Sequence, residues 1–292
     1  MKTPKRVVRP LQIAVKRSLL ARRVRAVAAG TMTAFNADLS DPDLDPGAVV
    51  LGVTRFLTVG SPALVRVVEA LRAAGTLDAL MNGLVDDDAR RRERCARLAG
   101  ALRLEAAVPW LGMQLNAVDR AVRRAAARAL GRIGGARSAE LLLGALRTRR
   151  LPPSRLIIEL SRAAPDLFIE SCLLSPQNTA VRAQLAAAAG LRGRRSGAHP
   201  LRRLVVEGTE RERSTACRGL GLIGDPEAAG PELSSALTHR SWRVRKAATR
   251  AFGVIGDRSR LPELNERLYD PNPSTRYAAA RAMRLVRTRD TK

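Results

Sequence analysis

The segment from Arg243 to Asp257, RVRKAATRAFGVIGD, joins a run of basic side chains to two closely spaced glycines. Such an arrangement could bind a phosphate group, because glycine turns at helix ends present backbone N–H groups to anions. However, Gly253 and Gly256 are not followed by the lysine of a phosphate-binding loop, and no strand-like segment precedes them. We therefore expect these glycines to shape the backbone, and we predict no nucleotide or other cofactor.

Side chains that serve as nucleophiles, general bases or metal ligands are scarce. The two histidines, His199 and His239, lie in predicted loops and are not at metal-ligand spacing. The three cysteines, Cys95, Cys172 and Cys217, are far apart and form no CxxC pair, which indicates reduced, buried thiols. We predict no catalytic residue and no metal site, and therefore a protein that is not an enzyme.

An acidic segment, NADLSDPDLDPG, contains the one spacing that suggests a metal ion. Asp41, Asp43 and Asp45 alternate as calcium ligands do in an EF-hand loop. The sixth position of that loop requires glycine and the twelfth requires glutamate, whereas Pro46 and Gly52 occupy them here. The segment is therefore predicted to be a linker and not a calcium site.

The balance of charges points to an acidic partner. The 292 residues include 52 basic and 27 acidic side chains, a formal net charge of +25. An acidic protein, a nucleic acid or an anionic membrane surface would each complement that charge. The alternative is a compositional bias, since only five of the basic residues are lysine.

Membrane-spanning and secretory segments are not predicted. No apolar run reaches the roughly 18 residues of a transmembrane helix. Residues 11–28 carry five basic side chains where a secretory signal would be apolar. We predict a cytoplasmic protein. The alternative is a protein bound peripherally to the inner face of the membrane.

One pattern recurs along most of the chain at intervals of about 31 residues. Its reference positions are Gly100, Gly131, Ser161, Gly190, Gly221, Gly253 and Arg284. Most have apolar residues five and one positions before them and two after, a spacing that forms one buried helical stripe. Gly134, Gly224 and Gly256 follow where a helix needs a left-handed C-cap, and Asp225 and Asp257 can cap the next helix. Two helices per unit at this period predict an all-α protein, an α-solenoid.

The units VRRAAARALGRIG, Val122 to Gly134, and WRVRKAATRAFGVIGD, Trp242 to Asp257, resemble HEAT-like repeats of the short, phycobilin-lyase type. The resemblance covers about two thirds of the chain and implies a right-handed α-solenoid (superhelix) of about seven helical hairpins. It says little about function, because that family includes scaffolds, adaptor subunits, a few lyases and DNA glycosylases.

Three regions are predicted along the chain. Residues 1–46 form a basic N-terminal helix and an acidic linker, residues 47–85 a degenerate helical N-terminal cap, and residues 86–292 the HEAT-like solenoid. Within the solenoid the copy at 148–173 departs most, because Pro152 and Pro153 stand where an arginine is expected. We predict a local break in the stack there.

The basic N-terminal segment has two possible roles. Pro10 could start a helix that carries Leu11, Val15 and Leu19 at a spacing of four. Residues 1–30 contain nine basic side chains and no acidic one, as expected of an amphipathic helix on anionic lipid or nucleic acid. The alternative is a capping helix with a solvated charged face, or an arm that is partly disordered.

One row of arginines lies at the edge of the predicted buried stripe, eight residues before the reference position. We predict that this row is a structural ladder that locks neighbouring units together. Its members are Arg92, Arg123, Arg182, Arg213, Arg245 and Arg276. Asp86, Glu207 and Asp270 lie six residues before three of these arginines and are the expected ion-pair partners.

A second row, three residues before the reference position, faces away from the core. In HEAT-like stacks the second helix usually lines the concave surface, so the resemblance places this row on a basic concave surface. With the neighbouring row one helical turn earlier, the candidate partner-binding residues are Arg97, Arg124, Arg128, Arg218, Lys246, Arg250, Tyr277 and Arg281. Ile158 and Ala187 interrupt the row and leave two basic patches. A solvated face with biased composition would explain the row equally well.

These observations favour a non-enzymatic scaffold or adaptor that binds an acidic partner, most simply a protein, on the basic concave surface. Nucleic-acid binding is the alternative. A DNA glycosylase of this fold would need a carboxylate near a concave tryptophan, and neither Trp110 nor Trp242 has one close in the sequence. A base-stacking role for Trp242 is possible, but packing in the core or between repeats is the favoured interpretation.

Overall fold

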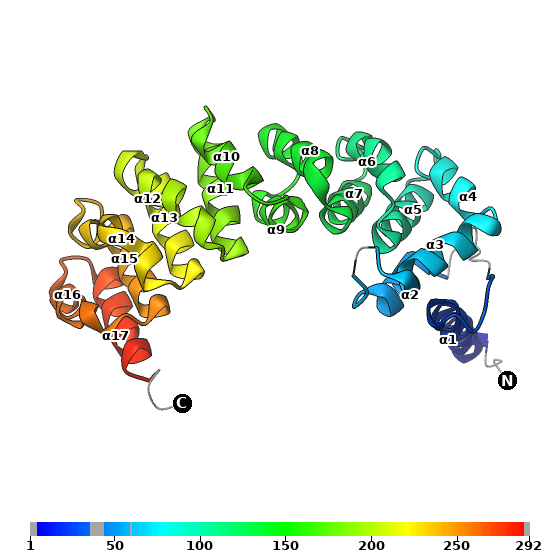
Figure 1. Cartoon of the computed structure of the whole chain (residues 1–292), viewed down its shortest axis with the longest axis horizontal. Helices are drawn as coiled ribbons and strands as arrows, with labels where there is room; N and C mark the ends of the chain where they lie inside the picture. The colour runs from blue at the N-terminus through cyan, green and yellow to red at the C-terminus, as the bar shows by residue number, and fades with distance from the viewer. Residues whose placement is uncertain (1–4, 36–43, 59, 289–292) are drawn as a thin grey trace. The chain divides into compact units, whose positions relative to one another are not determined.

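The computed structural model describes residues 5–35, 44–58 and 60–288, and all regular elements in these ranges are helices (Figure 1). The predicted all-α fold of helical hairpins is confirmed. Three N-terminal helices are α1 (Lys5–Ala29), α2 (Pro46–Thr54) and α3 (Pro62–Ala73). The first helices of the repeats are α4 (Thr76–Gly83), α6 (Val108–Gln114), α8 (Gly135–Thr148), α10 (Phe168–Leu174), α12 (Ala198–Glu207), α14 (Pro226–Ser235) and α16 (Leu261–Glu266). The second helices are α5 (Ala89–Leu102), α7 (Arg120–Ile133), α9 (Pro153–Ala163), α11 (Thr179–Arg192), α13 (Glu210–Ile223), α15 (Trp242–Ile255) and α17 (Pro273–Thr288).

The chain forms two compact units, Met1–Pro152 and Pro153–Lys292. The boundary coincides with the pair of prolines at which the sequence predicts a break. Pro153 is the first residue of α9, where the missing N–H removes no intrahelical hydrogen bond. Unit 1 therefore contains α1 to α8, and unit 2 contains α9 to α17.

Consecutive second helices pack side by side within each unit, α5 against α7 in unit 1 and α9, α11, α13, α15 and α17 in series in unit 2 (Figure 1). The approach is close. A Cβ atom added to Gly190 would lie 2.5 Å from the Cα atom of Gly219, and one added to Gly253 would lie 2.6 Å from that of Ala282. Any side chain at these reference positions would push the helices apart, which confirms the predicted structural role of Gly253.

The apolar stripe of the second helices is buried as predicted. Side chains five residues before the reference position have no exposed area at Cys95, Ala126, Leu185, Ala216, Ala248 and Ala279. These residues are mostly alanine, and their small side chains permit the close helix packing that the glycines require. Small residues thus form the contact layer between neighbouring second helices, while larger side chains such as Leu130 and Phe252 fill the rest of the core.

Capping groups define the helix ends. The Asp119 carboxylate accepts a hydrogen bond from the N–H of Ala121, and Asp225 and Asp257 cap the helices that follow them, as predicted. Gly256 ends α15 in the left-handed conformation, with φ of 80°. Gly134 differs from the prediction, because α8 begins at the next residue and the chain turns there with φ of 77° and ψ of −169°.

The N-terminal helix α1 begins at Lys5, so that Pro10 lies within it and does not start it. One face packs against α2 and α3 through the buried side chains Leu20, Val24 and Val27. The predicted stripe of Leu11, Val15 and Leu19 lies on an exposed face instead. Among the described residues, no helix is long and apolar enough to cross a membrane.

Candidate binding surface

The second helices of both units share one exposed side, which we call the second-helix face. It carries the positions seven and three residues before the reference position, where the sequence predicts partner-binding residues. At the latter position Arg128, Arg218, Arg250 and Arg281 are exposed, whereas Arg97 is half-buried. The helical register thus places the arginine row on the surface of both units.

In unit 2 this face forms a C-terminal basic cluster. Its members are Arg218, Lys246, Arg250, Tyr277 and Arg281, on α13, α15 and α17. Arg250 and Arg281 have no partner in the part of the chain that the structure describes. Arg218 donates to the Thr215 hydroxyl oxygen at 3.1 Å, and Lys246 lies over the Trp242 ring with its Nζ 5.4 Å from the centroid. None of these contacts cancels a positive charge.

Acidic residues are nearly absent from the helices that build this cluster. The sequences of α15 and α17 contain no aspartate or glutamate. The two glutamates of α13 are already engaged, Glu210 with Arg243 at 3.1 Å and Glu212 with Arg182 at 2.6 Å. The C-terminal basic cluster therefore presents positive charge that the fold itself does not neutralise.

In unit 1 the same face forms an N-terminal basic cluster of Arg97, Arg124 and Arg128, with a different environment. Arg97 forms ion pairs with both Asp45, the N-cap residue of α2, and Glu93. Burial alone would lower the pKa of Arg97, but the two carboxylates raise it overall. Arg124 is half-buried, and Arg128 is exposed without a partner in the described ranges. Most of the positive charge of this cluster is therefore covered or compensated.

An exposed apolar row lies beside the C-terminal basic cluster, one helical turn after the arginine row. It consists of Leu191, Leu222, Val254 and Leu285, which are between 38% and 52% exposed. Unit 1 has buried Ala101 and half-buried Arg132 at the equivalent positions. The sequence analysis did not predict this row, although the sequence contains its signal. Aliphatic residues recur one position after the reference position. This is four positions after the arginine row and therefore on the same side of the helix.

The predicted ladder arginines point into the turns between helices and bond to backbone oxygens. Arg123 donates to the carbonyl oxygens of Ala117 and Val118 at 2.7 and 2.6 Å. The same geometry recurs at Arg92, Arg213, Arg245 and Arg276. These hydrogen bonds satisfy carbonyl groups at or near the turn between the two helices of the same repeat. These backbone contacts stay within one repeat, and among the described contacts of this row only those of Arg182 and Arg245 also reach the next repeat, as a ladder between units requires.

The acidic partners of the ladder differ from those expected. The Asp86 carboxylate pairs with Arg91, and the Glu207 carboxylate pairs with Arg203. Their expected partners, Arg92 and Arg213, donate to backbone carbonyl oxygens instead. Asp270 likewise offers only its carbonyl oxygen to Arg276. These three predicted ion pairs were wrong.

Ion pairs between repeats do occur in unit 2. Arg245 binds both carboxylate oxygens of Asp270 in the next repeat, at 2.6 and 2.8 Å, and the Asp270 side chain is fully buried. These hydrogen bonds lower the pKa of Asp270. Arg182 reaches the buried Glu212 of its next repeat in the same way. Burial raises the pKa of Glu212, but hydrogen bonds from Arg182 and Thr209 lower it overall.

Residues with other possible chemistry have structural surroundings. His239 Nδ1 accepts a hydrogen bond from the Ser241 N–H in a turn, and His199 is exposed. Burial raises the pKa of Cys95 to about 11 and that of Cys217 to about 12, so both thiols are protonated at neutral pH. The described residues contain no cluster of three metal-ligating side chains. Asp41 and Asp43 lie outside these residues.

The two tryptophans lie in different units. Trp110 is on α6 and is 40% exposed, and Trp242 begins α15 beside Arg243 and Lys246. A carboxylate does approach Trp242, because Glu210 from the preceding repeat pairs with Arg243. The local sequence could not show this approach, since Glu210 lies about one repeat earlier.

The repeat is similar to that of a known protein family. Residues 77–160 and 230–292, just over half of the chain, match the family described as HEAT repeats. The chain belongs to the HEAT-repeat family. Similar solved structures include human deoxyhypusine hydroxylase, which is 20% identical in sequence. The match covers 94% of this chain and 99% of that chain, with a TM-score of 0.38.

Two further structures similar to this HEAT-repeat protein have lower identity. One is an engineered protein, at 18% identity over 83% of this chain and 78% of that chain, with a TM-score of 0.35. The other is Kap121p, at 14% identity over 82% of this chain and 33% of that chain, with a TM-score of 0.44. No curated protein matches the sequence.

Proposed function

We propose that this HEAT-repeat protein is a non-enzymatic scaffold or adaptor that binds an acidic partner protein through the second-helix face of unit 2. The observation that supports the proposal is the uncompensated charge of the C-terminal basic cluster. Four cationic side chains of this cluster lie on adjacent helices, and no carboxylate in the described ranges neutralises any of them.

Electrostatics alone would make this surface attractive to many anions. Exposed like charges on adjacent helices repel one another, and a partner with complementary acidic groups removes that repulsion. The exposed apolar row beside the cluster favours protein over nucleic acid, because a phosphate backbone offers nothing for four aliphatic side chains to bind. A peptide or protein surface supplies both acidic and apolar side chains.

The test compares the wild-type chain with Arg250→Glu/Arg281→Glu. Both arginines are exposed and unpartnered in the described structure, so the double variant should fold normally. We expect partner proteins that co-purify with the wild-type chain from its native cells to be lost with this variant. Binding to the purified partner should weaken at least about tenfold and should decline as salt rises.

A matched control carries the same change of charge on first helices, away from the second-helix face. Arg137→Glu/Arg203→Glu alters α8 and α12, where both side chains are exposed. Equal loss of partners with both double variants would contradict the proposed surface.

Nucleic acid is the second candidate partner and has its own arm of the test. Binding of short single-stranded RNA and duplex DNA is measured between about 50 and 200 mM salt. Tight binding that is lost with Arg250→Glu/Arg281→Glu, together with nuclease-sensitive co-purification, would replace the acidic protein by a nucleic acid. No binding at the lower salt concentration would eliminate that candidate.

A further inference from the structure

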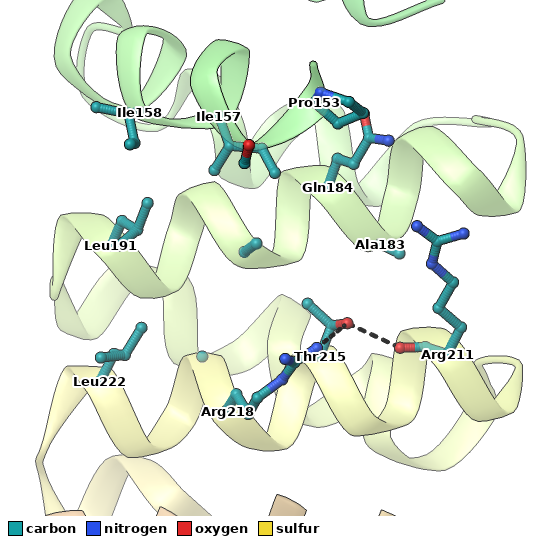
Figure 2. Close-up of a pocket in the computed structure, with 13 residues that line it drawn as sticks. Pro153, Ile157, Ile158, Ala183, Gln184, Leu191, Arg211, Thr215, Arg218 and Leu222 are labelled. Atoms are coloured by element: carbon teal, nitrogen blue, oxygen red, sulfur yellow. Dashed lines mark hydrogen bonds between the residues drawn. The ribbon is translucent and has the colours of Figure 1, made fainter. Parts of the chain in front are cut away.

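A pocket of about 520 Å³ lies within unit 2 between α9, α11 and α13, adjoining the C-terminal basic cluster (Figure 2). It occupies the place where Ile158 and Ala187 interrupt the arginine row. Both residues line it, and the small side chain of Ala187 makes room between the neighbouring helices. The interruption of the row is thus a hollow with a different chemistry.

The pocket has an apolar end and a cationic end (Figure 2). Ile158, Leu191 and Leu222 come from three consecutive second helices and gather at one end, each at least 41% exposed. Arg211 projects from α13 toward α11 at the other end, and its guanidinium has no partner among the residues described. Arg218, a member of the basic cluster, lies between the two ends.

A buried polar group in the wall also lacks a partner. Gln184 is more than nine-tenths buried and lines the pocket beside Pro153, and its side-chain oxygen accepts no hydrogen bond from the residues that the structure describes. A buried acceptor without a donor destabilises the protein, and rotation of this amide toward the pocket would let a donor on a bound molecule relieve that cost. An N–H group of a peptide backbone is a donor of this kind.

We propose that this pocket binds a peptide segment of the acidic partner, with an aliphatic or aromatic side chain at the apolar end and carboxylates against Arg211 and Arg218. The proposal rests on the proposed function and specifies its partner further. Charge complementarity supports it, because the only charged groups lining the pocket are the two arginines. Exposed aliphatic side chains at the opposite end require an apolar group in the same ligand.

A random peptide library displayed on phage tests this recognition without knowledge of the partner. The wild-type chain should enrich peptides that combine acidic residues with a large apolar residue. Leu222→Glu places a carboxylate at the apolar end and should weaken the selected peptides about ten- to a hundredfold. Because Leu222 is 52% exposed, the substitution should leave the fold intact, as thermal denaturation can verify.

Val254→Glu is the matched control, since Val254 lies in the same exposed row but outside the pocket. Both variants add one negative charge beside the cluster, so the difference between them measures the pocket alone. Enrichment of acidic peptides without an apolar residue, or equal weakening by the two variants, would overturn the pocket while leaving the basic cluster as a binding surface. Enrichment of no acidic peptide would also overturn it, and the co-purification experiment would then judge the scaffold function separately.

Discussion

Units 1 and 2 are built from the same type of repeat, but their acidic side chains lie at different positions in it. In unit 1, Asp45 and Glu93 lie at the second-helix face and neutralise Arg97. In unit 2, Glu212 and Asp270 are buried between repeats, where they hold Arg182 and Arg245. Unit 2 therefore has buried ion pairs between its repeats and keeps an uncompensated basic surface. In the described part of unit 1, by contrast, two carboxylates compensate Arg97 at the surface itself.

An arginine row does not by itself indicate a binding surface. The same register yields an ion-paired side chain at Arg97 and, among the residues described, an unpartnered one at Arg250. The deciding factor is the position of the carboxylates, because a nearby carboxylate competes with any partner for the guanidinium.

The largest effect should follow from removing a buried carboxylate of unit 2. Glu212→Ala leaves Arg182 without its partner and removes the capping box with Thr209, so the free energy of unfolding should fall by about 3 to 5 kcal/mol. Arg123→Ala in unit 1 breaks only hydrogen bonds to carbonyl oxygens and should cost about 1 to 2 kcal/mol. Urea denaturation followed by circular dichroism measures both.

Arg213→Ala provides a control within unit 2, because Arg213 bonds to the carbonyl oxygens of Val205 and Gly208. It should resemble Arg123→Ala rather than Glu212→Ala. If all three variants lose the same stability, the distinction between units has no energetic basis.

Acid should weaken unit 2 through Asp270. The folded-state pKa of Asp270 lies below its unfolded value, so its ion pair stabilises the fold above about pH 4 and is lost as pH falls through the folded-state pKa. Asp270→Asn should lower stability by about 3 kcal/mol at neutral pH, and its difference from wild type should shrink below about pH 4. Thermal denaturation across this pH range measures the difference; a constant gap would contradict the assigned ion pair.

A smaller effect is expected when the carboxylates at the second-helix face of unit 1 are removed, so that its arginine becomes uncompensated like those of unit 2. Asp45→Asn/Glu93→Gln removes both partners of Arg97, and asparagine keeps the ability to cap α2. One additional unpaired cation should strengthen binding of an acidic ligand about two- to threefold, corresponding to about half a kcal/mol. The comparison uses the purified partner in a titration, with Glu69→Gln as a control that frees an exposed arginine elsewhere. Weaker binding by the double variant would contradict this account of unit 1.

The smallest effect concerns the exposed face of α1. Leu11→Ser/Val15→Ser/Leu19→Ser should lower partitioning into phosphatidylserine vesicles only a few-fold, because the stripe has no aromatic anchor. The substitutions spare Leu20, Val24 and Val27, so stability should not change. Equal partitioning of both proteins would leave α1 with the capping role that its buried face indicates.

The helical repeat was largely predictable from the sequence, because local spacing determines it. The register at Gly253 recurs with the buried stripe, and each of the seven second helices contains its predicted reference position. Contacts between distant segments were not predictable in this way. Asp45 reaches Arg97 across 52 residues, and no spacing rule links them.

The candidate surface shows the same limit. The helical spacing predicted that Arg250 and Arg281 face outward, but from the sequence Ile158 and Ala187 were only interruptions of the arginine row. Their importance emerges only when α9, α11 and α13 lie side by side and form a pocket. A repeat must therefore be compared across its copies for apolar as well as charged exposed positions.

The positions of the two tryptophans provide an intrinsic optical reporter for each unit. Trp110 belongs to unit 1, whereas Trp242 lies in unit 2, within 5.4 Å of the Lys246 ammonium. In a Trp110→Phe background, the remaining indole emission would come from the edge of the C-terminal basic cluster alone. Ligand occupancy at that cluster could then be followed in real time and without a label, as a change in fluorescence intensity or emission maximum.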